Sequence, residues 1–491
     1  MIFNTKKKEN IYLSPYTPMT NGLEKYLKDT YGISICGYID ASKDGDEIYQ
    51  PTKIKKLSID KIFILSPSWA KEIYINLSEH ISSDKLVMIF KNNNLYRKSL
   101  LNYRLSRYID NILIKLINNI FDYFNIKIVK LWTNRIGEFC LETEAFLEQI
   151  KYNKVYKAQN IIVLSYIDKQ EIANNTLYNL YIDVLMKFDK LFLLKNNLLA
   201  KYLRYTLTNH YIKSKYCINI EQHSNAYELF MNKKQIIFFN KQDIIKGEKI
   251  LKKLNIFGPF VCIFARDSQY LVNTFKNQDW SYHNYRDADI NSYELAIKYL
   301  IKNGYTIVRI GSIVQNELLF KHAKCIDYPY NQFQSDFMDI FLISQCEFAI
   351  GGHSGILDIC NVFSKTRLGV NHMPIDAPPY STKDDIYIPK KLQLNGEYIG
   401  LKKYFEIINN SKLSHFKNET YEKLDLQIED NNSSEILMIV KEYLNDFKEC
   451  EADRKNLEMY YQIHSKSEWF SDVKTKISLL FLRENPWFIE A

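Results

Sequence analysis

Short apolar segments alternate with amphipathic helical patterns along most of this 491-residue sequence. In residues 10–100, the apolar segments IYLS, ISICGYID, KIFIL and KLVMIF are separated by helical stretches. Residues 126–195 and 256–371 repeat this pattern, with NIIVLSY, FVCIFAR, TIVRIG, CEFAIGG and TRLGVN as strand candidates. Such alternation favours parallel sheets covered by helices on both faces. We therefore expect an α/β fold with two doubly wound, Rossmann-like domains and a smaller N-terminal α/β module.

The length of the chain predicts several domains, because single hydrophobic cores stop growing near roughly 250 to 300 residues. We expect a Rossmann-like module over residues 1–105, α/β domains over 106–250 and 251–400, and a helical, polar region over 401–491. In the module, SPYTP follows the first strand where a dinucleotide binder has Gly-x-Gly-x-x-Gly. This departure favours a structural or docking role over nucleotide binding.

Charge and cysteine usage argue against several classes of protein. The formal net charge of +8 comes from 65 basic and 57 acidic residues spread along the chain. No zinc-ligand spacing or RNA-binding signature is present, so we expect no nucleic-acid partner. The eight cysteines lie far apart, which indicates neither a disulfide framework nor a zinc site. Without a signal-peptide pattern or a long apolar run, we expect a cytoplasmic protein.

Apolar residues recur three and four positions apart between residues 108 and 124, which predicts an amphipathic helix. Packing against a neighbouring domain is the simpler interpretation of its apolar face. Peripheral membrane contact is the alternative, although Asp110 and Asp122 accompany Lys115 on the polar face.

Polar residues that directly follow strand patterns mark the candidate site, because open parallel sheets bind ligands beyond the carboxyl ends of their strands. Arg266 follows VCIFA, and its planar, permanently charged guanidinium suits a phosphate. The alternative for Arg266 is a surface salt bridge to Asp267.

A glycine-rich turn, Gly351-Gly352-His353-Ser354-Gly355, follows the apolar CEFAI and opens a helical pattern. Its glycines would let backbone N–H groups approach an anion at the helix N-terminus, and the serine would either cap the helix or donate to a phosphate. A tight turn without a ligand is the alternative.

A third polar segment, HNYRDADI at residues 283–290, lies between Arg266 and the next helical pattern. We expect Arg286 to contact phosphate or sugar hydroxyls and His283 to do the same or to transfer a proton. The Asp287-x-Asp289 pair resembles a metal-binding DxD motif, but we interpret it as a loop and a helix cap.

Together these motifs resemble a family of bacterial glycosyltransferases of surface-glycan gene clusters. The resemblance covers roughly residues 126–400 and rests on TNRIGEF, FARDSQY, HNYRDADI, IVRIG, DFMDIFLISQCEFAIGGHSG and GVNHMP. The family is similar in turn to GT-B enzymes related to the protein O-fucosyltransferases. The resemblance implies that Arg266 holds a donor diphosphate with backbone contacts from Ser354 and Gly355. Asp336 and Asp339 match family positions, where either would orient the loop or reach the donor's ribose.

The same resemblance implies an acceptor-binding turn at Arg135 and Gly137. The family's turn reads Arg-Ile-Gly-His, whereas this sequence has Glu138 in place of the histidine. We therefore expect Glu138 to act as the base in a closed cleft. The alternative is an ordinary acidic residue at a helix N-terminus.

These motifs predict a glycosyltransferase that moves a sugar from a nucleotide-diphosphate donor to a glycan or other surface acceptor. GT-B enzymes usually act through side chains and helix ends, so we expect no metal ion and no cofactor. One alternative enzyme transfers a phosphoglycerol-type group from a CDP-activated donor through the same anion-binding elements. The alternative from another class is a non-catalytic scaffold that binds a nucleotide or a glycan.

Overall fold

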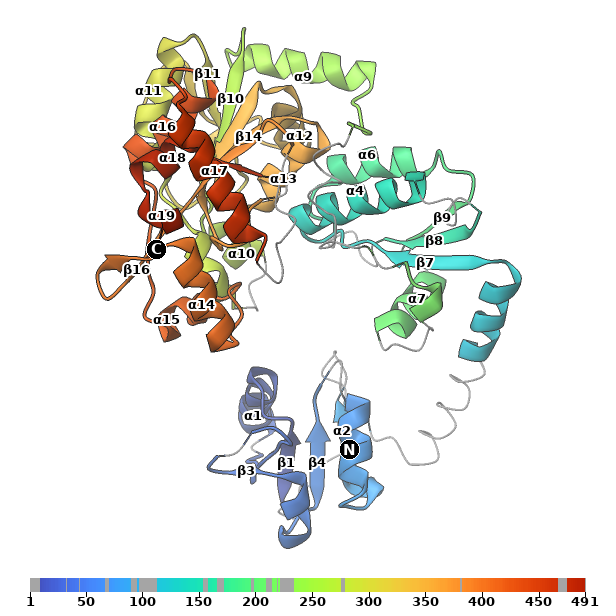
Figure 1. Cartoon of the computed structure of the whole chain (residues 1–491). Helices are drawn as coiled ribbons and strands as arrows, with labels where there is room; N and C mark the ends of the chain where they lie inside the picture. The colour runs from blue at the N-terminus through green and yellow to red at the C-terminus, as the bar shows by residue number, and fades with distance from the viewer. Residues whose placement is uncertain are drawn as a thin grey trace. The chain divides into compact units, whose positions relative to one another are not determined.

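The computed structural model describes residues 9–31, 33–43, 45–66, 70–89, 95–96, 113–152, 158–165, 172–195, 198–208, 214–218, 220, 234–274, 279–379, 382–466 and 475–490. The chain divides into two compact units, each described by itself. Unit 1 is Met1–Ile126 with Lys201–Cys217, and unit 2 is Lys127–Ala200 with Ile218–Ala491. The predicted α/β class with parallel sheets is confirmed (Figure 1).

Unit 1 contains a six-stranded sheet in the order β3-β2-β1-β4-β5-β6, parallel except for β6. Its strands are β1 (Ile11–Ser14), β2 (Gly37–Ile39), β3 (Ile48–Tyr49), β4 (Lys61–Ile64), β5 (Leu86–Ile89) and β6 (Leu95–Tyr96). Leu13 and Phe63 face helix α1 (Pro18–Tyr31), whereas Tyr12 and Ile62 belong to the apolar cluster on the side of helix α2 (Ala70–Ser78). The two-residue period of the strands therefore buries both faces of this sheet.

The SPYTP turn after β1 is closed by a side chain of the same unit. Asp40 is buried, and its carboxylate accepts hydrogen bonds from the backbone N–H groups of Tyr16 (2.9 Å), Ser42 (2.8 Å) and Lys43 (3.0 Å). Burial raises the pKa of Asp40, but these hydrogen bonds outweigh it and lower the pKa overall. The carboxylate thus takes an N–H donor of the β1–α1 turn that a bound anion would otherwise use.

The predicted amphipathic helix is helical over residues 113–123, and its first residues, 108–112, lie outside the described part of the chain. Phe121 is buried and meets Tyr216 edge to face at 5.5 Å, while Leu116 is 52% exposed. The expectation of one buried apolar face is therefore only partly correct. Among the described residues, no helix has the length and apolar character that crossing a membrane requires.

Unit 2 is built around a seven-stranded parallel sheet in the order β12-β11-β10-β13-β14-β15-β19. Its strands are β10 (Phe260–Phe264), β11 (Thr306–Arg309), β12 (Cys325–Asp327), β13 (Phe348–Gly351), β14 (Thr366–His372), β15 (Ile386–Pro389) and β19 (Lys476–Ile477). The chain builds outward from β10 in one direction and then, from β13, in the other. The switch point of this doubly wound sheet therefore lies between β10 and β13.

A smaller sheet of unit 2 has the order β7-β8-β9. Its strands are β7 (Ile126–Lys130), β8 (Asn160–Leu164) and β9 (Leu191–Leu194), and the helix that follows in the chain, α7 (Leu198–Thr208), belongs mostly to unit 1. Helix α4 (Ile136–Tyr152) packs against α13 (Gly355–Val362), and α6 (Asn175–Leu185) packs against α12 (Asp336–Gln345). One apolar cluster, which includes Phe139, Tyr181 and Phe341, runs through these helices and holds the two sheets together.

The remaining helices complete unit 2. They are α9 (Lys241–Lys253), α10 (Gln269–Thr274), α11 (Glu294–Lys302), α14 (Leu401–Ser411), α15 (Asn418–Lys423), α16 (Ser433–Tyr443), α17 (Glu451–His464), α18 (Leu479–Glu484) and α19 (Trp487–Glu490), with the single-turn helices η5 (Ser281–Arg286) and η6 (Ile290–Tyr293). A three-stranded antiparallel sheet adds β16 (Lys391–Leu394), β17 (Glu397–Tyr398) and β18 (Gln427–Glu429).

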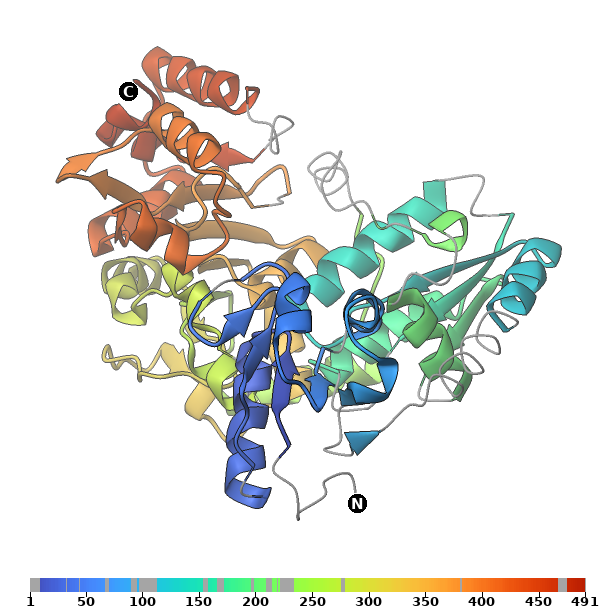
Figure 2. The ribbon, with the colours of Figure 1, turned by 90° about the horizontal axis from the view of Figure 1, so that it is seen from below.

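The region after residue 400 is mostly helical, as predicted, but it is not separate from the large sheet. Strand β19 pairs with β15, and α16 and α17 share a core with β14 and β15. These orange and red elements gather at the end of unit 2 away from the teal sheet in both views (Figures 1 and 2). The domain boundaries at residues 105, 250 and 400 stay predictions.

Candidate functional site

A cavity of about 420 Å³ opens at the switch point of the large sheet. Its wall is formed by residues 134–138, 173–174, 264–267, 311–314 and 353–356, with single side chains from neighbouring helices. All predicted site residues except His283 and Gly352 line this cavity. Gly352 is buried behind the wall, against the carbonyl oxygen of Val370.

Helices α4 and α13 begin at the same point of the cavity wall. A Cβ atom built on Gly355 would lie 2.5 Å from the backbone nitrogen of Gly137, and one built on Gly137 would lie 2.6 Å from the Cα atom of Gly355. Only glycine permits two backbones to approach this closely. Because helix N-termini carry partial positive charge and free N–H groups, this contact places two anion-binding ends beside one cavity.

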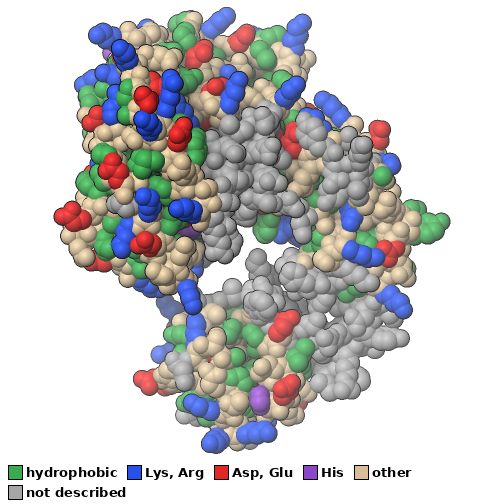
Figure 3. Space-filling view, viewed as in Figure 1, with side chains coloured by type: hydrophobic (Ala, Val, Ile, Leu, Met, Phe, Trp, Pro, Cys, Tyr) green, Lys and Arg blue, Asp and Glu red, His purple; other side chains and the backbone are tan. Residues whose placement is uncertain are grey.

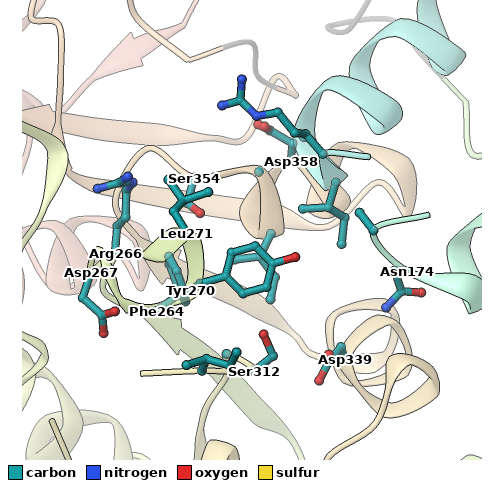
Figure 4. Close-up of a pocket in the computed structure, with 18 of the residues that line it drawn as sticks. Asn174, Phe264, Arg266, Asp267, Tyr270, Leu271, Ser312, Asp339, Ser354 and Asp358 are labelled. Atoms are coloured by element: carbon teal, nitrogen blue, oxygen red, sulfur yellow. The ribbon is translucent and has the colours of Figure 1, made fainter. Parts of the chain in front are cut away.

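Arg266 lies two residues after the end of β10 and is 6% exposed. Its guanidinium forms an ion pair with Asp287 and donates to the carbonyl oxygen of His283 at 3.3 Å. Figure 4 shows Arg266 and Asp267 extending in opposite directions from the end of the strand. The alternative of a salt bridge to Asp267 is therefore wrong, because that carboxylate accepts from the N–H groups of Gln269 and Gln315, both at 3.0 Å.

Arg286 ends η5 and, like Arg266 and Arg135, is a cation of the wall. It forms no ion pair with any described residue, although its guanidinium lies over the ring of Tyr285 at 5.6 Å. Burial lowers the pKa values of both Arg266 and Arg286, and the charge of Arg286 lowers that of Arg266 further. Two neighbouring guanidinium groups with one carboxylate partner leave positive charge that an anion would neutralise.

His283 lies on η5 behind these cations rather than in the cavity wall. Neither ring nitrogen has a hydrogen-bond partner in the described part of the chain, and the ring is tilted against that of Tyr282, with the ring centroids 4.0 Å apart. Burial lowers its pKa to about 3, and Arg286, Arg266 and Arg135 lower it too. A neutral imidazole of such low basicity, outside the wall, is poorly placed to remove a proton from an acceptor.

Glu138 lies in the first turn of α4, where it forms an ion pair with Arg135 at 2.7 Å. The two side chains are 40% and 35% exposed. The guanidinium of Arg135 also lies 5.7 Å from the ring of Trp280. The predicted base is therefore a solvent-accessible, paired carboxylate rather than one enclosed in a cleft.

His353 and Ser354 occupy the turn between β13 and α13. Nδ1 of His353 lies 2.8 Å from the carbonyl oxygen of Met373, so it donates to that oxygen, and burial keeps the pKa of His353 well below its usual value. Ser354 is the N-cap of α13, but its side chain makes no capping hydrogen bond. Of the two predicted roles, its hydroxyl thus remains suited to donation toward the cavity.

Asp339 and Asn174 lie on the side of the cavity opposite Arg266 (Figure 4). Asp339 accepts a hydrogen bond from the Tyr328 hydroxyl at 2.9 Å, and burial raises its pKa to about 7. The neighbouring Asp336 binds the other half of unit 2, because its carboxylate accepts from the N–H and the side-chain amide of Asn175, both at 2.8 Å. Of the two, Asp336 therefore has the structural role.

The Asp287-x-Asp289 pair serves the loop, as predicted. Asp287 binds Arg266, and Asp289 caps η6 by accepting from the N–H of Asn291 at 3.0 Å. No cluster of three or more His, Cys, Asp or Glu side chains is placed to hold a metal ion within the described ranges. On the face shown in Figure 3, basic and acidic side chains intermingle without a continuous basic patch.

Several residues of the wall were not predicted from the sequence. They are Asn134, Asn174, Tyr270, Leu271, Ser312, Gln334 and Asp358. Asp358 is the most informative, because it is 9% exposed and its Oδ1 atom accepts from Nη1 of Arg367 at 3.1 Å. Its position three residues after Gly355, within the first turn of the helix, is the signal that identifies it.

Comparisons with known proteins give no match to any family model and none to a curated protein. Among solved structures, a glycosyltransferase of family 9 from Veillonella parvula aligns with 11% identity over 65% of this chain and 97% of that chain, with a TM-score of 0.37. E. coli ADP-heptose heptosyltransferase II aligns with 13% identity over 55% and 92%, with a TM-score of 0.31. The dodecameric iron-containing glycosyltransferase TibC of E. coli aligns with 9% identity over 66% and 80%, with a TM-score of 0.34. With every score below 0.5, these partial overlaps carry no argument about chemistry, which therefore depends on the site itself.

Proposed function

We propose that this protein is a glycosyltransferase that binds a nucleotide-diphosphate sugar in the cavity between β10 and β13. The observation that carries this proposal is the contact between Gly137 and Gly355, which brings two helix N-termini to one cavity beside Arg266 and Arg286. A diphosphate suits this set of charges, because guanidinium groups and helix N–H groups both stabilise phosphate oxygens. The cavity volume of about 420 Å³ lies in the range of small-molecule sites, roughly 300 to 1,000 Å³.

In this proposal the diphosphate lies between the two arginines and the 352–355 turn, and the acceptor lies against residues 133–138. We assign the donor to the predicted 251–400 domain and the acceptor, a glycan or other surface polymer, to the 106–250 domain. When the sugar transfers, negative charge develops on the leaving diphosphate. Preorganised hydrogen-bond donors that stabilise such charge contribute roughly a hundredfold or more each to the rate. Side chains and helix ends supply this stabilisation in place of a metal ion.

The first test is binding and hydrolysis of adenosine, uridine, guanosine, cytidine and thymidine diphosphate sugars, with CDP-glycerol as the competing donor class. We expect one sugar donor to bind and hydrolyse slowly, and Arg286→Met to weaken its binding. Turnover of CDP-glycerol alone would replace the proposal with phosphoglycerol transfer. Tight nucleotide binding without any turnover would support the scaffold instead.

A further inference from the structure

We propose that Asp358 is the general base of the transfer reaction, with its Oδ2 atom accepting the proton of the acceptor hydroxyl. This inference rests on the proposed function. In the step, the hydroxyl oxygen forms a bond to the anomeric carbon while the bond from that carbon to the diphosphate breaks. The bonding electron pair leaves with the diphosphate, and the hydroxyl proton moves to Asp358.

The position of Asp358 carries the first part of the argument. The residue lies in the first turn of α13 and in the cavity wall. A Cβ atom on Gly137 would lie 3.0 Å from its Oδ2 atom, which places this oxygen against the predicted acceptor turn. Asp358 therefore lies where the donor turn at Gly355 and the acceptor turn meet.

The two oxygens of the carboxylate have different surroundings. Oδ1 accepts from Nη1 of Arg367 at 3.1 Å, and Arg367 is in turn fixed by Asp385, which accepts from its backbone N–H at 2.9 Å. The hydrogen bond between Arg367 and Asp358 uses Oδ1, and no hydrogen bond joins Oδ2 to a described residue. A carboxylate oriented through one oxygen and open at the other has the geometry of a general base.

The electrostatic surroundings agree with this role. Burial raises the pKa of Asp358 to about 6, while Arg367 and Arg286 oppose the shift. A base with a pKa near the working pH combines useful basicity with an ionised carboxylate at pH 7 and above. The charged groups on the elements around it are Arg367 on β14, Arg286 on η5, Arg135 and Glu138 at the start of α4, and Asp339 on α12.

The other acidic or basic candidates are less well placed. His283 lies outside the wall, with its pKa lowered to about 3, and Glu138 is paired with Arg135 at the exposed start of α4. Asp339 shares the wall with Asp358 but lies on the side where Tyr328 and Gln334 bind it. Asp358 alone among these side chains is enclosed, fixed through one oxygen and directed at the acceptor turn.

The test compares Asp358→Asn with Asp385→Asn and Glu138→Gln in the full chain. The probe is the nucleotide sugar that binds the wild type most tightly, with water as the acceptor, and the readouts are its Kd, kcat and the pH profile of kcat. Asp358→Asn should lower kcat roughly a hundredfold or more, leave Kd unchanged, and remove the acidic limb near pH 6. Asp385→Asn loosens the arginine that orients Asp358 but leaves the base in place, so it should lower the melting temperature, reduce kcat by less than Asp358→Asn does, and retain the acidic limb.

The outcomes separate this inference from the proposed function. If no donor binds, or Arg286→Met binds it like the wild type, the proposed function fails and the base assignment fails with it. If the donor binds and Arg286 is required, but Asp358→Asn turns over like the wild type or Glu138→Gln loses more activity, only the base assignment is wrong. A wild type that binds a donor and leaves it intact at pH 8 overturns the proposed function in favour of the scaffold, and the base assignment fails with it.

Discussion

Gly137, in the first turn of α4, and Gly355, the first residue of α13, touch backbone to backbone, so these two helices begin side by side although they are far apart in the sequence. The contact explains why neither position has a side chain. It also ties the turn at residues 133–138 to the turn at residues 351–355, because a shift of either helix would move the other. The site therefore depends on the packing of α4 on α13 as much as on its charged side chains.

Gly355→Ala should disturb this packing, because the added methyl group would lie 2.5 Å from the backbone nitrogen of Gly137. Overpacking of this kind costs about 1 to 3 kcal/mol, so we expect a lower melting temperature and loss of donor binding together. Thermal unfolding and a donor-binding titration measure the two effects. Gly258→Ala is the matched control, since its new methyl group meets nothing within 4 Å. Equal melting temperatures for the two variants would contradict the packing argument.

Arg286→Met should weaken binding of the donor without destabilising the fold. Hydrogen bonds to charged groups contribute about 1.5 to 3 kcal/mol, so the Kd should rise roughly 10- to 100-fold. Stability should stay the same or increase, because the variant removes a cation without an ion-pair partner among the described residues. Calorimetric titration and thermal unfolding test both parts. A variant that unfolds early but binds the donor normally would make Arg286 a structural residue.

The sequence predicted the location of the site better than its internal contacts. Arg266 and the turn at residues 351–355 follow apolar strand patterns, and parallel strands necessarily bring such residues to one sheet edge. The partner of Arg266 was not predictable in the same way. The adjacent Asp267 diverges from it, and Asp287 reaches it through the fold of the intervening loop.

Three further features escaped prediction for physical reasons. Strands β12 and β19 are only three and two residues long, so their apolar periodicity is too short to recognise. Glu138 stands where the family that the sequence resembles has a histidine, but its ion pair with Arg135 and its exposure depend on how α4 packs. Burial of Asp358 and its bond to Arg367 likewise arise only when β14 lies beside β13.

Lys390 should position the loop that holds Arg286 and Asp287. Its buried Nζ atom donates to the carbonyl oxygen of Asp287 at 2.5 Å and pairs with Asp430 at 2.7 Å. Lys390→Met leaves that carbonyl oxygen without its hydrogen-bond donor, which costs about 1 to 3 kcal/mol. The change should also weaken the ion pair between Asp287 and Arg266. We therefore expect both a lower melting temperature and a higher Kd for the donor.

Lys391→Met provides the comparison for this prediction. Lys391 is also buried and pairs with Glu429 and Glu435, but the ion pairs of its ammonium do not involve the loop that holds Arg286 and Asp287. The Lys391→Met variant should have a lower melting temperature and an unchanged Kd for the donor. If both variants weaken donor binding to the same extent, general loss of stability explains the effect and Lys390 has no positioning role.

Asp339→Asn should stabilise the protein at neutral pH and not at acidic pH. Burial, with a smaller contribution from Asp336, raises the pKa of Asp339 from 3.8 to about 7 in the folded state. Between these values the folded chain keeps a proton that the unfolded chain has lost, so wild-type stability falls as the pH rises from about 4 to 7. Integrated over this window, the loss is on the order of 2 to 4 kcal/mol, and the asparagine variant does not experience it.

The measurement is the difference in unfolding free energy between Asp339→Asn and the wild type at pH 5, 6, 7 and 8. It should grow in favour of the variant up to about pH 7 and then level off. Asp453→Asn is the control of opposite sign, because Arg483 lowers the pKa of Asp453 to about 2. The stabilisation from the ionised Asp453 is complete above 3.8, the pKa of this carboxyl in the unfolded chain, and is lost only as the pH falls through about 2. The loss of unfolding free energy in Asp453→Asn should therefore stay constant from pH 5 to 8. A difference for Asp339→Asn that is equally flat would show that this carboxylate is ionised in the folded protein at pH 5, and hence that burial does not govern its titration.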